Sequence, residues 1–363
     1  MFKELITLPC LWESLKTEPR PIFLYGTGNG ADKILDVCIR YDIQIAGVFA
    51  SSGFVRSRTF RDMPVRSIEA IREEFGEDFV VLLAFGTTLD SVIENINEIA
   101  KRHTLYIPEV PLYDSPLFDR EFFISNYDSI VAASEIFSDE ESKKLYYDMI
   151  RFRLSGEPKY LSRVMTPTSM YSSLINEVVV SKVIDCGAYK GDSASDIISS
   201  LHPKELHAFE PDPKTFIKLT DFANSVSECK VTTYNFAVGN DTSTVEFNSS
   251  GSRGSGAEGT NKRGKTTEVA ISSLDSFEFK DIDLIKYDVE GDEVAAINGS
   301  LKTITSCLSA LSISVYHRSQ DIFEIPLKIK QISPEYRFYL RRVPCIPAWD
   351  ISFVAVPENK IKI

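Results

Sequence analysis

The sequence lacks several features that mark specialised classes of protein. Its six cysteines are scattered, and no two of them form the Cys-x-x-Cys pair of a zinc or redox site. Basic residues number 40 against 52 acidic ones, so the net charge of -12 provides no general attraction for nucleic acid or an anionic membrane. The sequence also lacks a bilayer-length apolar run and a recognisable secretory signal. We therefore expect a cytoplasmic protein with reduced thiols and without a nucleic-acid partner.

The sequence does contain enough chain for more than one hydrophobic core. Its 363 residues, 43% hydrophobic and 25% charged, exceed the length at which single cores usually stop growing. Strand and helix patterns alternate in both halves, which is typical of α/β domains. We expect a small Rossmann-like domain over residues 1–125, a helical connector over 126–175 and a second Rossmann-like domain over 176–363.

Two segments between the strands have clear local signals. "SDEESKKLYYDMIRFRLSG" predicts one helix, with Ser138 as N-cap, Glu141 completing a capping box and Gly156 at its end. "NSSGSRGSGAEGTNKRGK", residues 248–265, is rich in glycine and serine and almost without apolar residues. This composition predicts a mobile loop.

The first of two glycine motifs is "YGTGNGA", in which Gly26, Gly28 and Ala31 fit the Gly-x-Gly-x-x-Ala pattern of a dinucleotide site. The acidic residue expected after the next strand is missing, because "IAGVFASS" ends in alanine and serines. Three arginines follow: Arg56, Arg58 and Arg61. They could face a phosphate or form a solvated surface. An NAD(P)-dependent, sugar-modifying oxidoreductase is therefore kept as an alternative, beside substrate docking or formation of a homodimer by this domain.

The second glycine motif is "VIDCGAYKGDS". A strand ends at Asp185, and Gly187 and Gly191 permit a tight turn before a helix whose N-terminal amides would face a ligand. The next strand ends at Glu210, where an acidic side chain can hold both hydroxyls of a ribose. The two signals together favour a ribose-bearing ligand at the carboxyl edge of the sheet.

A third charged segment is "DLIKYDVEGDE", which places Lys286, Asp288 and Glu290 at alternate positions of an apolar strand. Such charges are costly to bury unless they are used at the sheet edge or paired with one another. Both interpretations stay open, including an internal Lys–Asp or Lys–Glu pair.

Four blocks of residues 183 to about 356 carry a family resemblance: "VIDCGAYKGD", "HAFEPDP" with "YNFAVGN", "SSLDSF" followed by "IDLIKYDVEGDE", and "LSISVYHRSQDIFEIP". This region resembles the FkbM family of S-adenosylmethionine-dependent methyltransferases. The resemblance implies a seven-stranded methyltransferase sheet whose last hairpin includes one antiparallel strand. It also implies S-adenosylmethionine as cofactor and transfer of a methyl group to a hydroxyl of a sugar, glycan or related small molecule.

The resemblance also implies which residues bind the cofactor. The glycine loop would hold its methionine end, Glu210 its ribose and the "FAVGN" segment its adenine, with Asp288 beside the transferred methyl. The implied set is Asp185, Gly187, Ala188, Gly191, Glu210, Ala237, Val238 and Asp288. The chain departs from the family at Tyr189, where many members have asparagine, and at Arg342, where histidine is expected.

For catalysis the candidates are Asp288 and His317. Asp288 could act as a base or as a ligand of a divalent cation, whereas His317 is the more natural base at neutral pH or a structural histidine. Glu290 and Glu293 could complete a metal site, but their spacing does not require one, so no metal is expected. A non-catalytic nucleotide-binding scaffold is the remaining alternative, and Tyr189 in the cofactor loop is its only indication.

Overall fold

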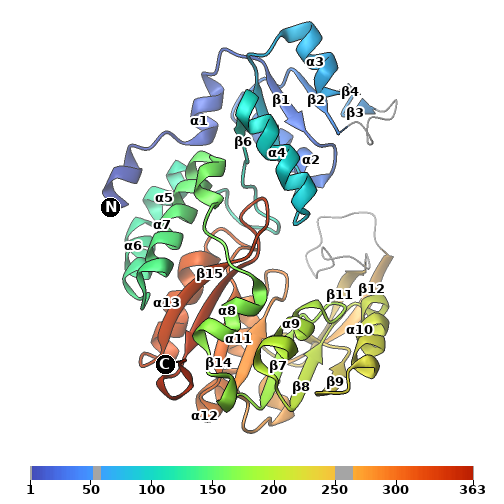
Figure 1. Cartoon of the computed structure of the whole chain (residues 1–363), viewed down its shortest axis with the longest axis vertical. Helices are drawn as coiled ribbons and strands as arrows, with labels where there is room; N and C mark the ends of the chain where they lie inside the picture. Colours follow the sequence, from blue (N-terminus) through green and yellow to red (C-terminus); the bar gives the residue numbers. More distant parts are fainter. Residues whose placement is uncertain (1, 52–58, 250–264, 363) are drawn as a thin grey trace.

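The computed structural model describes residues 2–51, 59–249 and 265–362. A six-stranded sheet and a seven-stranded sheet lie at opposite ends of the molecule, with helices between them (Figure 1). This arrangement confirms the α/β fold with two Rossmann-like sheets. Arg56, Arg58 and most of the expected mobile loop lie outside the described residues, and the expected domain boundaries stay predictions.

The N-terminal sheet has the strand order β3-β4-β2-β1-β5-β6. Its strands are β1 (Ile22–Tyr25), β2 (Gly47–Phe49), β3 (Thr59–Phe60), β4 (Met63–Arg66), β5 (Val80–Leu83) and β6 (Thr104–Tyr106). Its helices are α1 (Leu11–Lys16), α2 (Asn29–Arg40), α3 (Ile68–Phe75) and α4 (Asp90–Arg102). Successive side chains of β1 point to opposite faces: Phe23 packs with α3 and α4, and Leu24 with α1 and α2.

The helical segment contains α5 (Arg120–Ser125), α6 (Tyr127–Glu135), α7 (Glu140–Ser155) and α8 (Pro167–Leu174). The N-cap of α7 is Asp139 rather than the expected Ser138, because the Asp139 carboxylate accepts the Ser142 N–H at 2.8 Å. Ser138 instead accepts the backbone N–H of Phe338 in the C-terminal sheet. Gly156 ends the helix in the left-handed conformation, as expected.

The C-terminal sheet has the strand order β15-β16-β14-β13-β7-β8-β9. Its strands are β7 (Lys182–Cys186), β8 (Glu205–Phe209), β9 (Lys230–Tyr234), β13 (Leu284–Tyr287), β14 (Ala310–Ser314), β15 (Arg337–Arg342) and β16 (Ile351–Val356). β16 runs antiparallel to both of its neighbours, and the other described pairs in this sheet are parallel. The fold that the resemblance implied is therefore confirmed.

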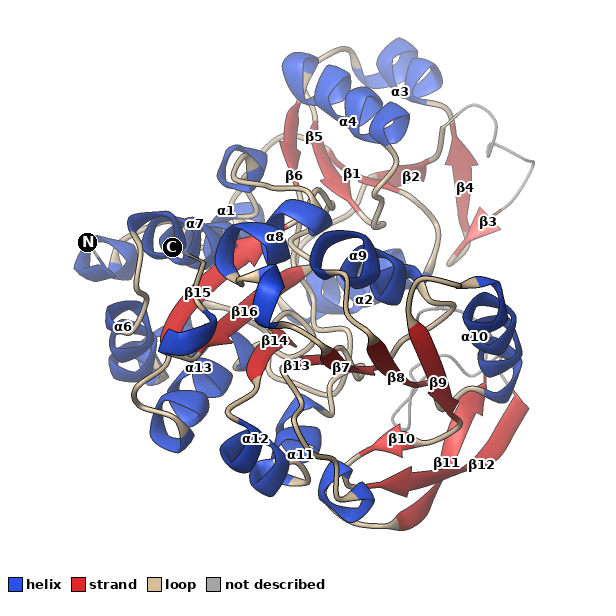
Figure 2. Cartoon of the chain, turned by 60° about the horizontal axis from the view of Figure 1, so that its bottom comes forward, coloured by secondary structure: helices blue, strands red, loops and turns tan. Residues whose placement is uncertain are grey.

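Helices cover both faces of this sheet (Figure 2). α8 and α9 (Asp192–Leu201) pack on one face, with α10 (Pro213–Ser225) beside β9. α11 (Glu293–Asn298), α12 (Leu301–Cys307) and α13 (Asp321–Ile332) pack on the other. α11 and α12 are separated at Gly299, whose backbone packs against Gly239. A small sheet of β10 (Ala237–Val238), β11 (Ser243–Ser249) and β12 (Lys265–Ser272) completes this half.

The two sheets share part of their hydrophobic core. One cluster of buried side chains runs from Phe23 and Phe79 in the N-terminal half, through Tyr146 and Phe152 of α7, to the C-terminal sheet. α7 packs against β15 and α6 against α13, so the helical segment lies on the edge of the C-terminal sheet. None of the described helices is long and apolar enough to cross a membrane.

Candidate functional site

A cavity of about 1280 Å³ lies between the two halves, where the loops after strands of both sheets meet. The N-terminal half contributes residues from the start of α2 and the loop after β5, and the C-terminal half contributes the loops after β7, β8, β13 and β14. These loops follow the carboxyl ends of parallel strands, the usual position of ligands in α/β sheets. Six of the residues singled out for function line this cavity: Gly187, Glu210, Ala237, Val238, Asp288 and His317.

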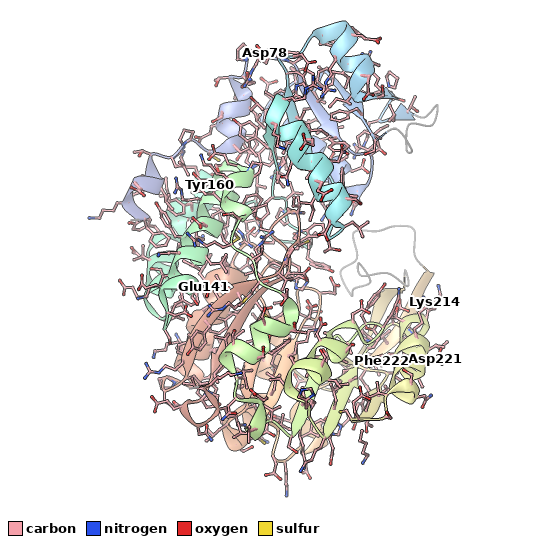
Figure 3. All side chains as sticks on the ribbon, viewed as in Figure 1. Asp78, Glu141, Tyr160, Lys214, Asp221 and Phe222 are labelled. Carbon is pink, nitrogen blue, oxygen red and sulfur yellow. The ribbon has the colours of Figure 1, made fainter. Side chains whose placement is uncertain are left out.

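The loop after β7 depends on its two glycines. Gly187 has a φ of +79°, and a Cβ atom at this position would lie 1.8 Å from the Asp288 carbonyl oxygen. Gly191 has a φ of +97°, and its Cβ would overlap the ring of Phe222 on α10, which Figure 3 labels. Only glycine permits both approaches, so the loop lies close against the end of β13 and against α10. Ala188, between them, is buried and donates its N–H to Phe209.

Asp185 and Lys286 form the internal pair that the strand pattern left open. Asp185 is fully buried, lies 3.1 Å from the Lys286 ammonium and accepts a hydrogen bond from Ser193 at 2.7 Å. Lys286 also donates to the Gly187 carbonyl oxygen at 3.1 Å. Burial lowers the pKa of Lys286, but the charges of Asp185 and Asp288 raise it by a larger amount. The net pKa is raised, so the ammonium stays charged. The pair thus holds the glycine loop from beneath, and Asp185 does not line the cavity.

Glu210 lies at the end of β8 and is 7% exposed. Its two oxygens accept the backbone N–H groups of Tyr189 at 3.0 Å and Asp212 at 2.8 Å. Burial, together with the charge of Asp212, raises the pKa of Glu210 to about 7, although the two N–H groups oppose this shift. Tyr189, at the family departure, has a left-handed φ of +50° and lines the cavity beside Glu210. Its backbone therefore continues the glycine turn despite the change of side chain.

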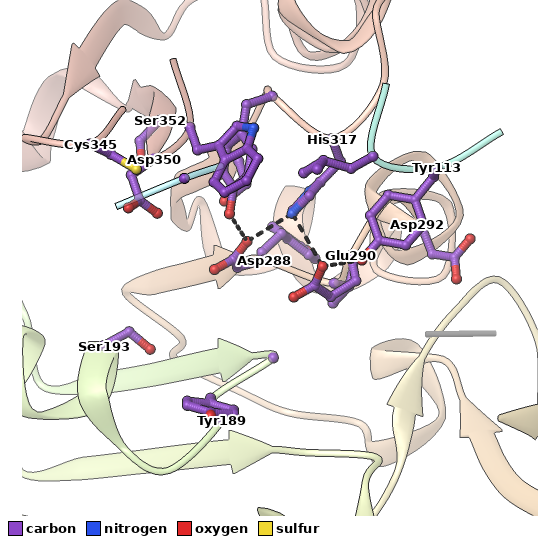
Figure 4. A pocket seen from close by; sticks show the side chains of 18 of the residues that line it. Tyr113, Tyr189, Ser193, Asp288, Glu290, Asp292, His317, Cys345, Asp350 and Ser352 are labelled. Carbon is purple, nitrogen blue, oxygen red and sulfur yellow. Dashed lines mark hydrogen bonds and ion pairs between the residues drawn. The ribbon is translucent and has the colours of Figure 1, made fainter. Parts of the chain in front are cut away.

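His317 lies at the centre of a group of carboxylates (Figure 4). Its Nδ1 is 2.9 Å from Glu293, and its Nε2 is 3.6 Å from Asp288 and 3.7 Å from Glu290. Burial lowers the pKa of His317, but the three carboxylates outweigh it and raise the pKa to about 10. In this arrangement His317 carries a proton at neutral pH, so it would act as a counter-charge or an acid before it could act as the base first expected.

The pKa of Asp288 is shifted in the opposite direction from that of His317. Burial raises the pKa of Asp288, but Lys286 and His317 lower it by more, so the side chain is a carboxylate. Its Oδ1 also accepts a hydrogen bond from the Tyr316 hydroxyl at 3.3 Å. The side chain is 30% exposed, toward the cavity that it lines. An acceptor hydroxyl could therefore reach Asp288 without displacing the ion pairs behind it.

Glu290 and Tyr113 join the two halves at this site. The Tyr113 hydroxyl donates to Glu290, and its ring meets the His317 ring edge to face at 5.8 Å. Glu290 has a left-handed φ of +59°, and burial, followed by the charge of Asp288, raises its pKa to about 7. No local pattern marks Tyr113 as functional, because only the tertiary fold brings it to a strand end of the other half.

The loop after β5 meets the loop between β15 and β16. Thr87 and Ile346 exchange two backbone hydrogen bonds of 2.7 and 3.0 Å. Gly86 lies so close to Trp349 that an added Cβ would be 2.1 Å from the indole. Both loops line the cavity, so the N-terminal half forms one wall of the same site.

The first glycine motif forms the tight turn that its spacing predicts. Gly26 has a φ of +122°, Gly28 is the N-cap of α2, and a Cβ on Gly30 would lie 2.5 Å from the Ala84 carbonyl oxygen. Within the described residues that follow β2, Ala50 and Ser51, there is no carboxylate for a ribose. Arg61 forms ion pairs with two aspartates of α2 at 2.7 and 3.3 Å, as a surface residue does.

The site residues fit S-adenosylmethionine in two respects. Gly187 and Gly191 leave the cofactor loop without a side chain at the two positions of close approach, as a cradle for the methionine end requires. The carboxylates of Asp288 and Glu290 suit the positive charge of a sulfonium. Arg342, the second family departure, is buried and donates to the carbonyl oxygens of Leu161 and Cys345, so it has a structural position.

Comparisons with known proteins agree with this arrangement. Residues 185–339 match the family model "Methyltransferase FkbM domain". The structure of the methyltransferase FkbM from Methylobacillus flagellatus KT has a TM-score of 0.70 at 18% identity, over 97% of this chain and 92% of that one, which shows a shared fold. An rRNA methylase from Streptococcus thermophilus has a TM-score of 0.34 at 10% identity, over 55% and 96% of the two chains. TYW2 from M. jannaschii in complex with AdoMet has a TM-score of 0.30 at 16% identity, over 52% and 72%.

A sequence comparison with curated proteins finds no match. The family match supports S-adenosylmethionine as the cofactor of a methyltransferase. Over residues 185–339, this chain carries a methyltransferase FkbM domain.

Proposed function

We propose that this chain is an O-methyltransferase that uses S-adenosylmethionine to methylate a hydroxyl group of a sugar, glycan or related small molecule. The observation that carries the proposal is the single cavity in which the glycine loop, Glu210 and the Asp288–His317 cluster meet. S-adenosylmethionine supplies an activated methyl group on a sulfonium, so the protein must bind and orient two substrates and remove one proton.

We assign the cofactor to the side of the cavity formed by the loops after β7 and β8. The turn at Gly187 and Gly191 would hold the methionine end, and Glu210 would accept hydrogen bonds from the ribose hydroxyls. Ala237 and Val238 of β10 would contact the adenine. Asp288, the cluster member whose side chain is 30% exposed toward the cavity, would stand beside the methyl group.

The charges of the cavity favour a neutral or cationic acceptor. Among the described residues that line it, nine are aspartate or glutamate and two are lysine. Lys33 is directed to the carbonyl oxygens of Pro111 and Leu112, and Lys286 to Asp185. A phosphate-bearing acceptor would be repelled by these carboxylates, whereas the hydroxyls of a sugar can donate to them. The aromatic side chains of Tyr113 and Trp349 add an apolar wall.

The roles of the cluster follow from its geometry. Asp288 would accept a hydrogen bond from the acceptor hydroxyl and align its oxygen with the methyl group. The O–C bond forms as the C–S bond breaks, and the hydroxyl proton must leave. Glu290 is placed to receive it, since its side chain is 30% exposed and lines the cavity, whereas Glu293 is buried. His317 would balance the charge of both carboxylates.

A transfer assay with isotopically labelled methyl donor tests this function. The acceptors are neutral oligosaccharides, amino sugars and nucleotide-linked sugars, and the methylated atom is located by NMR. We expect an O-methyl product with neutral or amino sugars and at least tenfold less with nucleotide-linked sugars. An N-methyl product, or transfer to nucleotide-linked sugars alone, would contradict the proposal.

A further inference from the structure

We propose that Asp288, Glu293 and His317 form a binding site for one divalent metal ion at the floor of the cavity. Each of the three side chains offers one ligand atom, and these atoms all lie within 4.8 Å of one another. They come from three segments, namely the loop after β13, the first turn of α11 and the loop after β14. Because the packed sheet holds all three, the site is formed before an ion enters.

Glu293 provides the observation that points most directly to a missing ligand. It is 1% exposed, and its Oε1 accepts the Val289 N–H and faces Nδ1 of His317, each at 2.9 Å. Its Oε2 is buried and has no hydrogen-bond partner in the part of the chain that the structure describes. A buried carboxylate oxygen without a partner is costly, and a cation bound there would satisfy it.

His317 lies between the other two ligand groups. Its Nδ1 is 2.9 Å from Glu293, and its Nε2 is 3.6 Å from Asp288 Oδ1. An ion held by all three side chains would replace a proton of the imidazole as the positive group between these two carboxylates.

The local charge also favours a cation. Four carboxylates interact electrostatically with His317: Asp288, Glu290, Glu293 and Asp321. Positive groups that face them include His317 itself, Lys286, which is shared with Asp185, and Arg153, which is shared with Glu109. Buried negative charge is therefore in excess, and a divalent ion would offset it.

Two carboxylates and one imidazole suit ions such as Mn²⁺, Fe²⁺ or Zn²⁺, with the remaining coordination positions open to water or substrate. The site itself is independent of the proposed function, but the role of the ion rests on it. Bound to the ion, the acceptor hydroxyl would lose its proton more readily, and Glu290 would receive that proton. The oxygen then forms its bond to the methyl carbon as the C–S bond breaks.

Mn²⁺ binding to the full-length protein, after treatment with a chelator, tests the site. Titration followed by electron paramagnetic resonance should find one ion per chain, with coupling to one imidazole nitrogen. His317→Gln should abolish the nitrogen coupling, and Asp288→Asn should weaken binding by about 10- to 100-fold. Asp241→Asn, at another part of the cavity wall, is the matched control and should leave both unchanged.

Absence of saturable binding of Mn²⁺, Mg²⁺ and Zn²⁺ would overturn the proposal. So would Mn²⁺ affinity that Asp288→Asn leaves unchanged, or bound Mn²⁺ without nitrogen coupling. Asp288→Asn is the deciding variant because Asp288 is partly exposed, whereas Glu293→Gln also removes an acceptor from the Val289 N–H. A parallel titration with S-adenosylhomocysteine separates the two proposals. Binding of the cofactor product without binding of a metal would overturn the metal site and leave the proposed methyltransferase function standing.

Discussion

Replacing Glu210 by glutamine should remove a large part of the pH dependence of folding. The pKa of Glu210 is raised from 4.5 to about 7, a difference that corresponds to about 3 kcal/mol between the two protonation states. Because the pKa is raised in the folded protein, the contribution is fully present below pH 4.5 and is lost as the pH rises through 7. The wild-type protein should therefore lose about 3 kcal/mol of stability through this group between pH 5 and pH 8.5.

The variant also loses one acceptor, because a glutamine cannot accept both the Tyr189 and the Asp212 N–H groups. This loss should cost about 1–3 kcal/mol at every pH, so the difference between the two proteins carries the test rather than either absolute value. Titrating groups that do not interact with Glu210, such as Asp321, are present in both proteins and cancel in the difference.

Urea unfolding at several pH values measures this difference. The free energy of unfolding of Glu210→Gln, relative to that of the wild type, should increase by about 3 kcal/mol between pH 5 and pH 8.5. Glu228→Gln, an exposed carboxylate near the end of α10, is the control and should follow the wild-type curve over this range. If the free energy of unfolding had the same pH dependence in the wild type and in Glu210→Gln, the prediction would be refuted. The variant should also bind S-adenosylhomocysteine about 10- to 100-fold more weakly.

Three further changes give predictions of different kinds. Gly187→Ala should abolish binding of S-adenosylhomocysteine and destabilise the fold by at least about 1–2 kcal/mol. Gly28→Ala, whose added Cβ would meet no atom within 4 Å, should change the affinity and the stability little. Calorimetry measures the affinity, and urea unfolding measures the stability. Tyr113→Phe should lower turnover through loss of its hydrogen bond to Glu290 and leave cofactor affinity unchanged, and a changed affinity would place Tyr113 in the cofactor site instead. Arg341→Ala should destabilise the protein by about 2–4 kcal/mol in thermal or urea unfolding, because the buried guanidinium pairs with Asp139 at 2.6 Å; a loss below about 0.5 kcal/mol would contradict this.

Much of the fold could be predicted because its signals are local. The apolar strands of both sheets and the glycine turns at Gly26 and Gly187 appear in short windows of sequence. β15 has no clear strand pattern of its own, because Arg341 and Arg342 make its sequence look exposed. Both side chains are buried and have partners distant in sequence on the helical segment, Asp139 for Arg341 and the Leu161 carbonyl oxygen for Arg342. Burial by long-range pairing cannot be inferred from the strand alone.

The candidate site was predictable to the same extent. Glu210 and Asp288 follow strands that the sequence marks clearly, and both line the cavity. The protonation of His317 could not be anticipated, because it depends on three carboxylates that only the fold brings together. Tyr113 was missed for a similar reason, since its partner Glu290 lies 177 residues further along the chain.

The central claim is that the glycine loop after β7, rather than the one after β1, binds the nucleotide. Calorimetric titration of the purified protein with S-adenosylmethionine, S-adenosylhomocysteine and NAD tests it most directly, with Gly187→Ala and Gly28→Ala measured beside wild type. We predict saturable binding of the two sulfur nucleotides at one site per chain, lost in Gly187→Ala and kept in Gly28→Ala. Binding of NAD alone, lost in Gly28→Ala, would contradict the account.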